Sequence, residues 1–270
     1  ELGAKSIVGV EDLSTVSYTQ DSVTLENFED TLSNFDYQFE QEVHSVYGIF
    51  GQELGSFLYQ VGLRGEYAVQ APNLVSQNQQ FFKTYANLFP SGHLKYLVKD
   101  NQEFSLSYSR RINRPGSRSL NPFTSYADPL NLSRGNPNLD PEYINSFDFG
   151  YSITNKKLIL TTSVYHRITK DVINRVTVYD DNYAISTRAN VDQSVITGGE
   201  LIIIYKPFPW LKNTISGSAN YKEYTDSNPI TDWNNKGFSW GVKYVGSIDF
   251  WKKTASFQIN WNYRAPYVTP

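Results

Sequence analysis

The stretch RGNPNLDPEY at positions 134–143 separates two runs of alternating residues. EFSLSYSRR (103–111) before it and INSFDFGYSIT (144–154) after it alternate polar with apolar side chains, a pattern that predicts β-strands with one apolar face. The span 112–143 between them holds five of the twelve prolines. Proline removes a backbone donor from a sheet and asparagine favours turns, so this span is predicted to be a long loop that contains no strand.

The same alternation recurs along the chain. In five predicted strands, one face carries twenty residues, none of them charged: Phe104, Leu106, Tyr108, Phe147, Phe149, Tyr151, Ile153, Ile215, Gly217, Ala219, Tyr221, Phe238, Trp240, Val242, Tyr244, Ala255, Phe257, Ile259, Trp261 and Tyr263. The opposite face of these strands carries serine, asparagine, glycine and a few charged residues, and no large apolar side chain. A helix would scatter such a set around its circumference, because it has 3.6 residues per turn. Each segment is therefore predicted to be a strand with one apolar and one polar face.

About eleven strands are predicted, at 2–17, 38–53, 57–71, 83–99, 103–112, 144–154, 157–178, 184–205, 211–224, 236–249 and 253–264. Short connections alternate with long ones, which lie near 19–37, 73–81, 112–143 and 225–235. The short connection at 179–183 does not fit this rule. Aromatic residues crowd the short turns, as at Phe208, Trp210 and Phe250. Short turns at one end, long loops at the other and rings near the turns are typical of a transmembrane β-barrel.

A soluble β-sandwich also has strands with one apolar and one polar face, and it remains an alternative at this point. The connection lengths and the aromatic turns favour the barrel. The predicted fold class is therefore all-β: a transmembrane antiparallel β-barrel, present in part, with about eleven strands of a larger barrel. Eleven strands are half of the 22 found in plugged outer-membrane transporters. Residues 1–270 would then form one partial barrel domain.

Composition narrows the function classes. The net charge of −3 gives no reason to expect a nucleic acid partner. The chain has no cysteine, so disulfides and thiolate chemistry are excluded. No apolar run approaches the ~20 residues of a membrane-spanning helix. Aromatic residues make up 15% of the chain, which suits a protein at a boundary between lipid and water.

The sequence shows no sign of an enzyme. His44, His93 and His166 lie on different predicted strands without metal-ligand spacing. YDDNY (179–183) offers too few oxygen ligands for calcium, and no serine lies in a GxSxG setting. No catalytic residue, metal site or cofactor is predicted.

The long loop contains the candidate ligand-binding residues. It should be an ordered extracellular loop folded over the lumen, because it carries many apolar residues. Arginine suits carboxylates and aromatic rings suit sugar faces, so an anionic or polyhydroxy ligand is one interpretation. The simpler interpretation is charge balance on a wet surface and packing against a plug. The candidates are Arg111, Arg114, Arg118, Tyr126, Asp128 and Arg134.

SYSRRINRPGSRSLNPFTSYADPLNLSRGNPNLDPEYINSFDFGY (107–151) closely resembles the barrel of TonB-dependent outer-membrane receptors. The resemblance is to the outer-membrane β-barrel branch, in which RRxxRP is followed by LNPF and then by GNPxLxPE. YQVGLRGE (59–66), NLFPSGHLKY (87–96) and NWNYRAPYVT (260–269) also resemble that branch, so the likeness covers almost the whole chain. In the family, the arginine-proline element caps an ascending strand and NPxLxPE begins the next descending one.

The resemblance implies a receptor in the bacterial outer membrane that imports a scarce nutrient, such as a glycan, siderophore or peptide. It implies outer-membrane lipid, the TonB energy-coupling complex, a surface lipoprotein and a small or oligomeric nutrient as partners. TonB acts through a plug domain, and nothing in residues 1–270 resembles that domain, its coupling box or the remaining strands. The alternative is a barrel that does not transport and serves in assembly, anchoring or adhesion.

Overall fold

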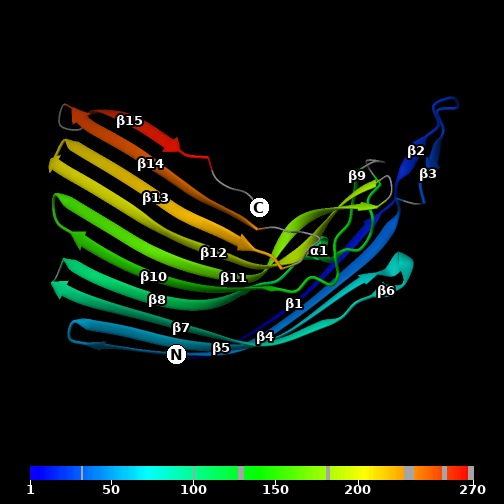
Figure 1. The fold of residues 1–270 in the computed structure, drawn as a ribbon, viewed down its shortest axis with the longest axis horizontal. Coiled ribbons are helices and arrows are strands. Elements are labelled where there is room, and N and C mark those ends of the chain that lie inside the picture. The colour runs from blue at the N-terminus through cyan, green and yellow to red at the C-terminus, as the bar shows by residue number, and fades with distance from the viewer. Residues whose placement is uncertain are drawn as a thin grey trace.

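The computed structural model describes residues 1–31, 33–99, 101–126, 131–180, 183–227, 234–250 and 254–266. They form one large curved antiparallel sheet (Figure 1). Within these residues, eleven long strands pair in sequence order: β1 (Leu2–Thr15), β4 (Phe35–Leu54), β5 (Phe57–Leu74), β7 (Lys83–Lys99), β8 (Gln102–Asn113), β10 (Glu142–Thr154), β11 (Leu158–Asp180), β12 (Tyr183–Phe208), β13 (Leu211–Thr225), β14 (Asn235–Phe250) and β15 (Ala255–Arg264). β1 and β15 form the two edges of this sheet. None of the described helices is both long and apolar enough to cross a membrane.

Short elements occupy the long connections. They are β2 (Tyr18–Gln20), β3 (Asn27–Glu29), the 3-10 helix η1 (Val75–Gln77), β6 (Gln79–Gln80), α1 (Ser117–Leu120) and β9 (Asn131–Ser133). In Figure 1 the short turns lie at the left end of the sheet, and α1, β9 and the β2–β3 hairpin lie toward the right end. The two classes of connection therefore lie at opposite ends of the strands.

The eleven predicted strands are confirmed, with ends that differ by a few residues. The prediction that 112–143 contains no strand is wrong in its middle, where Leu132 of β9 pairs in parallel with Ile185 of β12. β8 also extends to Asn113 and β10 begins at Glu142. Local composition does not reveal β9, because its partner strand lies about fifty residues later in the sequence. The loop at 19–37 likewise contains the β2–β3 hairpin.

The strand register separates an apolar face from a polar face. Residues directly opposite each other in neighbouring strands project from the same side of a sheet. Leu106 lies opposite Phe149, and Phe149 lies opposite Val164 on the next strand. The intervening Ser107 lies opposite Asp148. The alternation in sequence therefore becomes one apolar and one polar face across the sheet.

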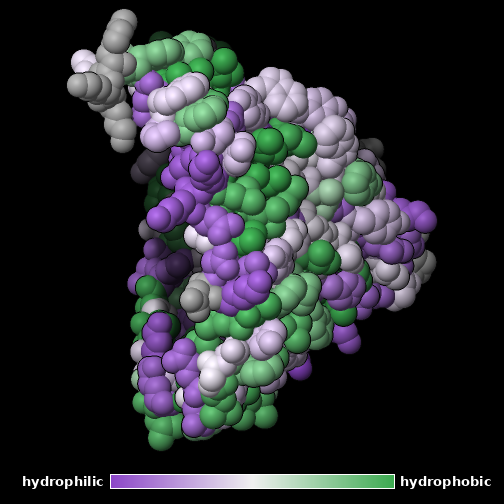
Figure 2. Space-filling view, turned by 90° about the vertical axis from the view of Figure 1, so that its left-hand side faces the viewer, coloured by the Kyte–Doolittle hydropathy of each residue, from purple (hydrophilic) through white to green (hydrophobic). Residues whose placement is uncertain are grey.

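The apolar face is exposed, as a lipid-facing surface would be. Phe147 is 45% exposed, Trp240 42% and Phe257 54%. In the part of the chain that the structure describes, no second large sheet covers them. Hydrophobic side chains form broad green areas beside hydrophilic ones when the molecule is viewed from the short-turn end (Figure 2). An exposed apolar area of this extent is unusual in a soluble protein, so the β-sandwich alternative is excluded.

Aromatic rings lie on the apolar face, some of them near the short turns. Near the short turns, Phe57 stacks on Tyr96 with ring centroids 4.5 Å apart, and Phe208 stacks on Trp210 at 5.2 Å. Farther from those turns, Tyr108 and Phe147 lie 4.9 Å apart. Rings near the short turns are typical of a barrel wall at a membrane–water interface.

A charged substitution should destabilise the protein less on the polar face than on the apolar face. We expect Ser107→Arg to change the stability of the folded protein by less than ~1 kcal/mol, because Ser107 lies beside His93 and Asp148 on the polar face. Urea unfolding in lipid vesicles measures this. A variant that fails to fold would contradict the assignment of Ser107 to a water-facing surface.

Candidate functional site

The long loop packs onto the polar face of the sheet. Leu120 of α1 and Leu139 of the RGNPNLDPEY stretch join Tyr37, Phe39 and Leu74 in one buried cluster. Each of the five is no more than 5% exposed. A fully buried leucine contributes about 1.5–3 kcal/mol. The loop is therefore held by a small hydrophobic core of its own, at the end of the sheet away from the short turns.

Two buried hydrogen bonds fix the start of this loop. The Tyr37 hydroxyl donates to the Ser117 carbonyl oxygen at 3.0 Å, and Gln70 Nε2 donates to the Pro115 carbonyl oxygen at 3.0 Å. Burial, assisted by the charge of Glu11, raises the pKa of Tyr37 well above its usual value. The hydroxyl therefore remains a donor at any physiological pH.

The RGNPNLDPEY stretch (134–143) approaches α1 very closely. The Gly135 amide donates to the Asn121 carbonyl oxygen at 2.8 Å, and the Asn136 amide donates to the Ser119 carbonyl oxygen at 2.7 Å. A Cβ atom on Gly135 would lie 2.6 Å from both of these carbonyl oxygens. Only glycine fits such an approach between two backbones, and this explains the residue's place in the stretch.

Lys83 holds the same stretch from β7. Its Nζ donates to the carbonyl oxygens of Asn138 and Leu139 at 2.7 and 2.8 Å, and it pairs with the Asp140 carboxylate at 2.8 Å. An ammonium group has three donors, and Lys83 uses one on each partner. The loop is thus attached to the sheet on this side.

Asn190 and Glu142 attach the loop to the extended β11–β12 hairpin. The Asn190 side chain donates to the carbonyl oxygens of Asp140 at 2.9 Å and Asp171 at 2.7 Å. Glu142 Oε1 accepts the Ile173 amide at 2.7 Å. Burial, with repulsion from Asp140, raises the pKa of the Asp171 carboxyl. The stretch that interrupts the strands is therefore an anchor that ties the loop, β7 and the hairpin together.

A buried ion pair lies under the loop. Arg114 donates to Glu66 Oε2 at 2.6 Å, and Arg64 pairs with Glu66 Oε1 at 3.1 Å. The side chains of Glu66 and Arg114 are 8% and 14% exposed. Arg64 also lies over the Phe89 ring, 5.0 Å from its centroid. One carboxylate thus bridges two arginines and connects the loop to β5.

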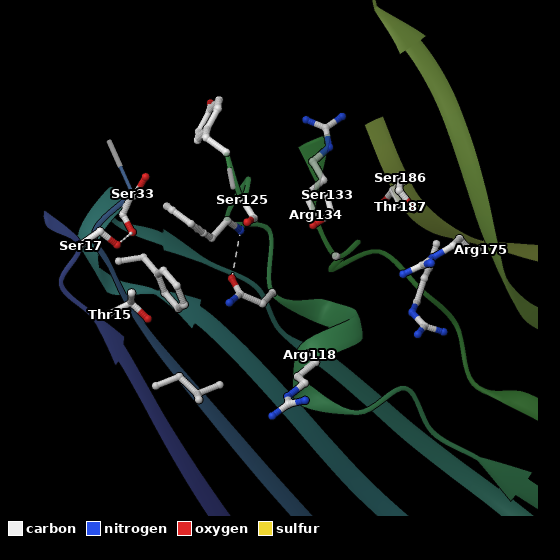
Figure 3. Close-up of a pocket in the computed structure, with 17 residues that line it drawn as sticks. Thr15, Ser17, Ser33, Arg118, Ser125, Ser133, Arg134, Arg175, Ser186 and Thr187 are labelled. Carbon is white, nitrogen blue, oxygen red and sulfur yellow. Dashed lines mark hydrogen bonds between the residues drawn. The ribbon is translucent and has the colours of Figure 1, made fainter. Parts of the chain in front are cut away.

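The loop, the β11–β12 hairpin and the end of β1 enclose a pocket of about 610 Å³. Its walls combine aromatic rings, hydroxyl groups and arginines. Figure 3 shows Arg118 entering from α1, Arg175 entering from β11, and Arg134 extending from the end of β9 in a different direction from Arg118. The lining residues are Leu13, Thr15, Ser17, Ser33, Phe35, Arg118, Asn121, Phe123, Ser125, Tyr126, Ser133, Arg134, Gly135, Arg175, Ser186, Thr187 and Arg188. We call this cavity the arginine pocket.

The structure brings together three of the six candidate ligand-binding residues. Arg118, Tyr126 and Arg134 line the arginine pocket. Arg114 lies in the ion pair with Glu66 instead. Arg111 lies on the polar face opposite an isoleucine of β10 and does not line this pocket. The sixth candidate, Asp128, lies outside the described residues.

Sequence reasoning missed Arg175 and Arg188. They lie directly opposite each other on β11 and β12 and both line the pocket. A signal was present in the sequence, because Arg175 lies four residues before the short connection at 179–183 and Arg188 lies five residues after it. Treating that connection as the turn of one long hairpin would have predicted their pairing. Among the described residues, no group of three or more His, Cys, Asp or Glu side chains could hold a metal ion.

Comparison with solved structures finds the same sheet in outer-membrane receptors. The FrpB iron transporter from Neisseria meningitidis (F5-1 variant) matches with 18% identity and a TM-score of 0.58, over 87% of this chain and 34% of that one. The copper transporter OprC matches with 16% identity and a TM-score of 0.60, over 90% and 40%. The Serratia marcescens hemophore receptor HasR, in complex with its hemophore HasA and heme, matches with 10% identity and a TM-score of 0.63, over 97% and 52%. At these identities the likeness shows the fold alone.

The chain spans about a third of the FrpB structure and about half of HasR. A comparison with curated proteins finds no match. A family model described as "Outer membrane protein beta-barrel family" matches residues 1–270, the full length of the chain. The exposed apolar face, the rings near the short turns and the two classes of connection are the features expected of such a protein. The chain therefore belongs to the outer membrane protein beta-barrel family and lies in the bacterial outer membrane.

Proposed function

We propose that this chain forms part of the barrel of a TonB-dependent receptor that imports a nutrient across the outer membrane. The observation that carries the proposal is the pocket of about 610 Å³ that described residues of the loop form with the β11–β12 hairpin on the polar face. Small-molecule sites usually measure ~300–1,000 Å³. A barrel that serves only as an anchor has no need of such a pocket.

The likeness to solved receptors supports this proposal. These proteins are an iron transporter, a copper transporter and a hemophore receptor, so the fold serves transport or ligand binding in them. For this chain we propose energy-coupled uptake of a glycan, siderophore or peptide. The proposed partners are the TonB complex, acting through a plug domain, and a surface lipoprotein that delivers the nutrient. In this proposal the protein binds and transports the nutrient without changing it chemically, so it does not act as an enzyme.

Growth of the bacterium that encodes this chain tests the proposal. We expect deletion of the gene to abolish growth when one glycan, siderophore or peptide class is the sole source of carbon or iron. Deletion of TonB should cause the same defect, because uptake by this route requires inner-membrane energy. Unchanged growth on every source, combined with loss of surface adhesion or envelope integrity, would instead support the assembly, anchoring or adhesion alternative.

A further inference from the structure

Four arginines line the arginine pocket without a neutralising partner. Arg118, Arg134, Arg175 and Arg188 form no ion pair with any described residue, and no acidic side chain is among the residues that line the pocket. Elsewhere in the loop region the arginines have an acidic partner, since Arg64 and Arg114 both pair with Glu66. The pocket thus concentrates four positive charges on its walls.

Two of these charges are placed against each other. Arg175 and Arg188 are direct cross-strand partners, so their side chains project from the same face of the hairpin. Like charges directly opposite in a sheet are destabilising. A hairpin that needed only to be stable would gain from a carboxylate at either position. The arrangement is explained if an anion from outside the chain lies between the two guanidinium groups.

The remaining walls favour a ligand that carries more than charge. Phe35 and Phe123 stack with ring centroids 4.3 Å apart, and Tyr126 also lines the pocket. Ser125, Ser133, Ser186 and Thr187 supply hydroxyl groups. Guanidinium groups bind carboxylates and phosphates with two parallel hydrogen bonds, and aromatic rings present faces on which a flat apolar group can lie. The arginine side chains and the aromatic rings of the pocket therefore suit one ligand that has both anionic groups and an apolar part.

We infer that the arginine pocket binds a small polyanion, with two or more carboxylate, phosphate or sulfate groups attached to a ring or other apolar body. This inference rests on the proposed function and names the substrate class of the same receptor. Arg175 and Arg188 bind one anionic group between them, and Arg118 binds a second group from the loop side. The loop and the hairpin, which Asn190 and Glu142 already connect, hold the two halves of the site together.

Equilibrium binding of benzene-1,3,5-tricarboxylate to the purified protein in detergent micelles tests the inference. We expect saturable binding to one site, with an affinity that falls at least tenfold between 50 mM and 500 mM NaCl, because salt screens exposed charges. The double variant R175Q/R188Q should bind at least tenfold more weakly. Its thermal midpoint should stay the same or rise, because the variant removes a like-charge pair. A residue pair with only a structural role would not give this combination.

Arg110→Gln is the matched control. It removes an arginine that lies over the Tyr143 ring, 5.5 Å from its centroid, and that does not line the pocket. Its affinity for the tricarboxylate should equal that of the unchanged protein. Absence of binding, or equal loss in R110Q and R175Q/R188Q, would overturn the inference. The binding assay needs no energy source, so it can fail while energy-dependent uptake persists, and it can succeed when deletion of the gene leaves uptake intact.

Discussion

Replacing Phe149 with arginine is expected to destabilise the folded protein in lipid by ~2–4 kcal/mol, the cost of an arginine at the middle of a barrel's lipid face. Phe149 lies between Leu106 and Val164 in neighbouring strands. On its own strand, Phe147 and Tyr151 lie on either side of it on the same apolar face. Its 49% exposure in the isolated chain is therefore contact with hydrocarbon in the membrane. An arginine there loses hydration without gaining a partner.

Urea unfolding of both variants in lipid vesicles measures this cost. Ser107→Arg is the matched control, since it adds the same side chain to the neighbouring strand on the polar face. Both variants add the same charged side chain. The difference between their free energies of unfolding therefore measures the effect of the sheet face alone. Equal stabilities for F149R and S107R would contradict the two-faced sheet, and with it the membrane assignment.

The strands could be predicted from the sequence because the membrane enforces a simple pattern. Each strand faces hydrocarbon on one side and water on the other, so the two-residue period appears without interference from a second layer. Tyr108, Phe147 and Phe149 follow it, and the register places them on one face. The short connection at 179–183 departs from the expected alternation because β11 (23 residues) and β12 (26 residues) stay paired as one hairpin as far as Asp180 and Tyr183.

The candidate site could be predicted only in part because it is made by contacts between distant segments. Arg118 and Arg134 were found because they lie in a loop too rich in proline to be membrane strand. Arg175 and Arg188 look like ordinary polar-face residues until the loop is placed beside the hairpin by β9 and Asn190. Arg114 shows the opposite case, since it lies only four residues before Arg118 in the same loop but its guanidinium pairs with Glu66. The local sequence does not show which arginine forms an ion pair with a carboxylate.

Removing the Glu66 carboxylate should be the most damaging single change to the loop. We expect Glu66→Ala to destabilise the folded protein by ~3–5 kcal/mol, because breaking a buried ion pair leaves an uncompensated charge. In this variant Arg114, 14% exposed, would keep its burial and lose its only carboxylate among the described residues. Arg64 would then repel it rather than share a partner with it. The Tyr37–Ser117 and Gln70–Pro115 hydrogen bonds and Leu120 would then hold the start of the loop without the ion pair.

Glu103→Ala supplies the comparison that makes the Glu66 result specific. Glu103 pairs with Lys95 at 3.1 Å on the same polar face, but these side chains are 35% and 31% exposed. An exposed pair contributes only ~0–1 kcal/mol, so E103A should unfold near the unchanged protein. In E66A, limited proteolysis should also cut within 112–143 before the strands unfold, because the loop is released first. Equal unfolding midpoints for E66A and E103A, with an uncut loop, would mean that the hydrophobic cluster around Leu139 holds the loop without the ion pair.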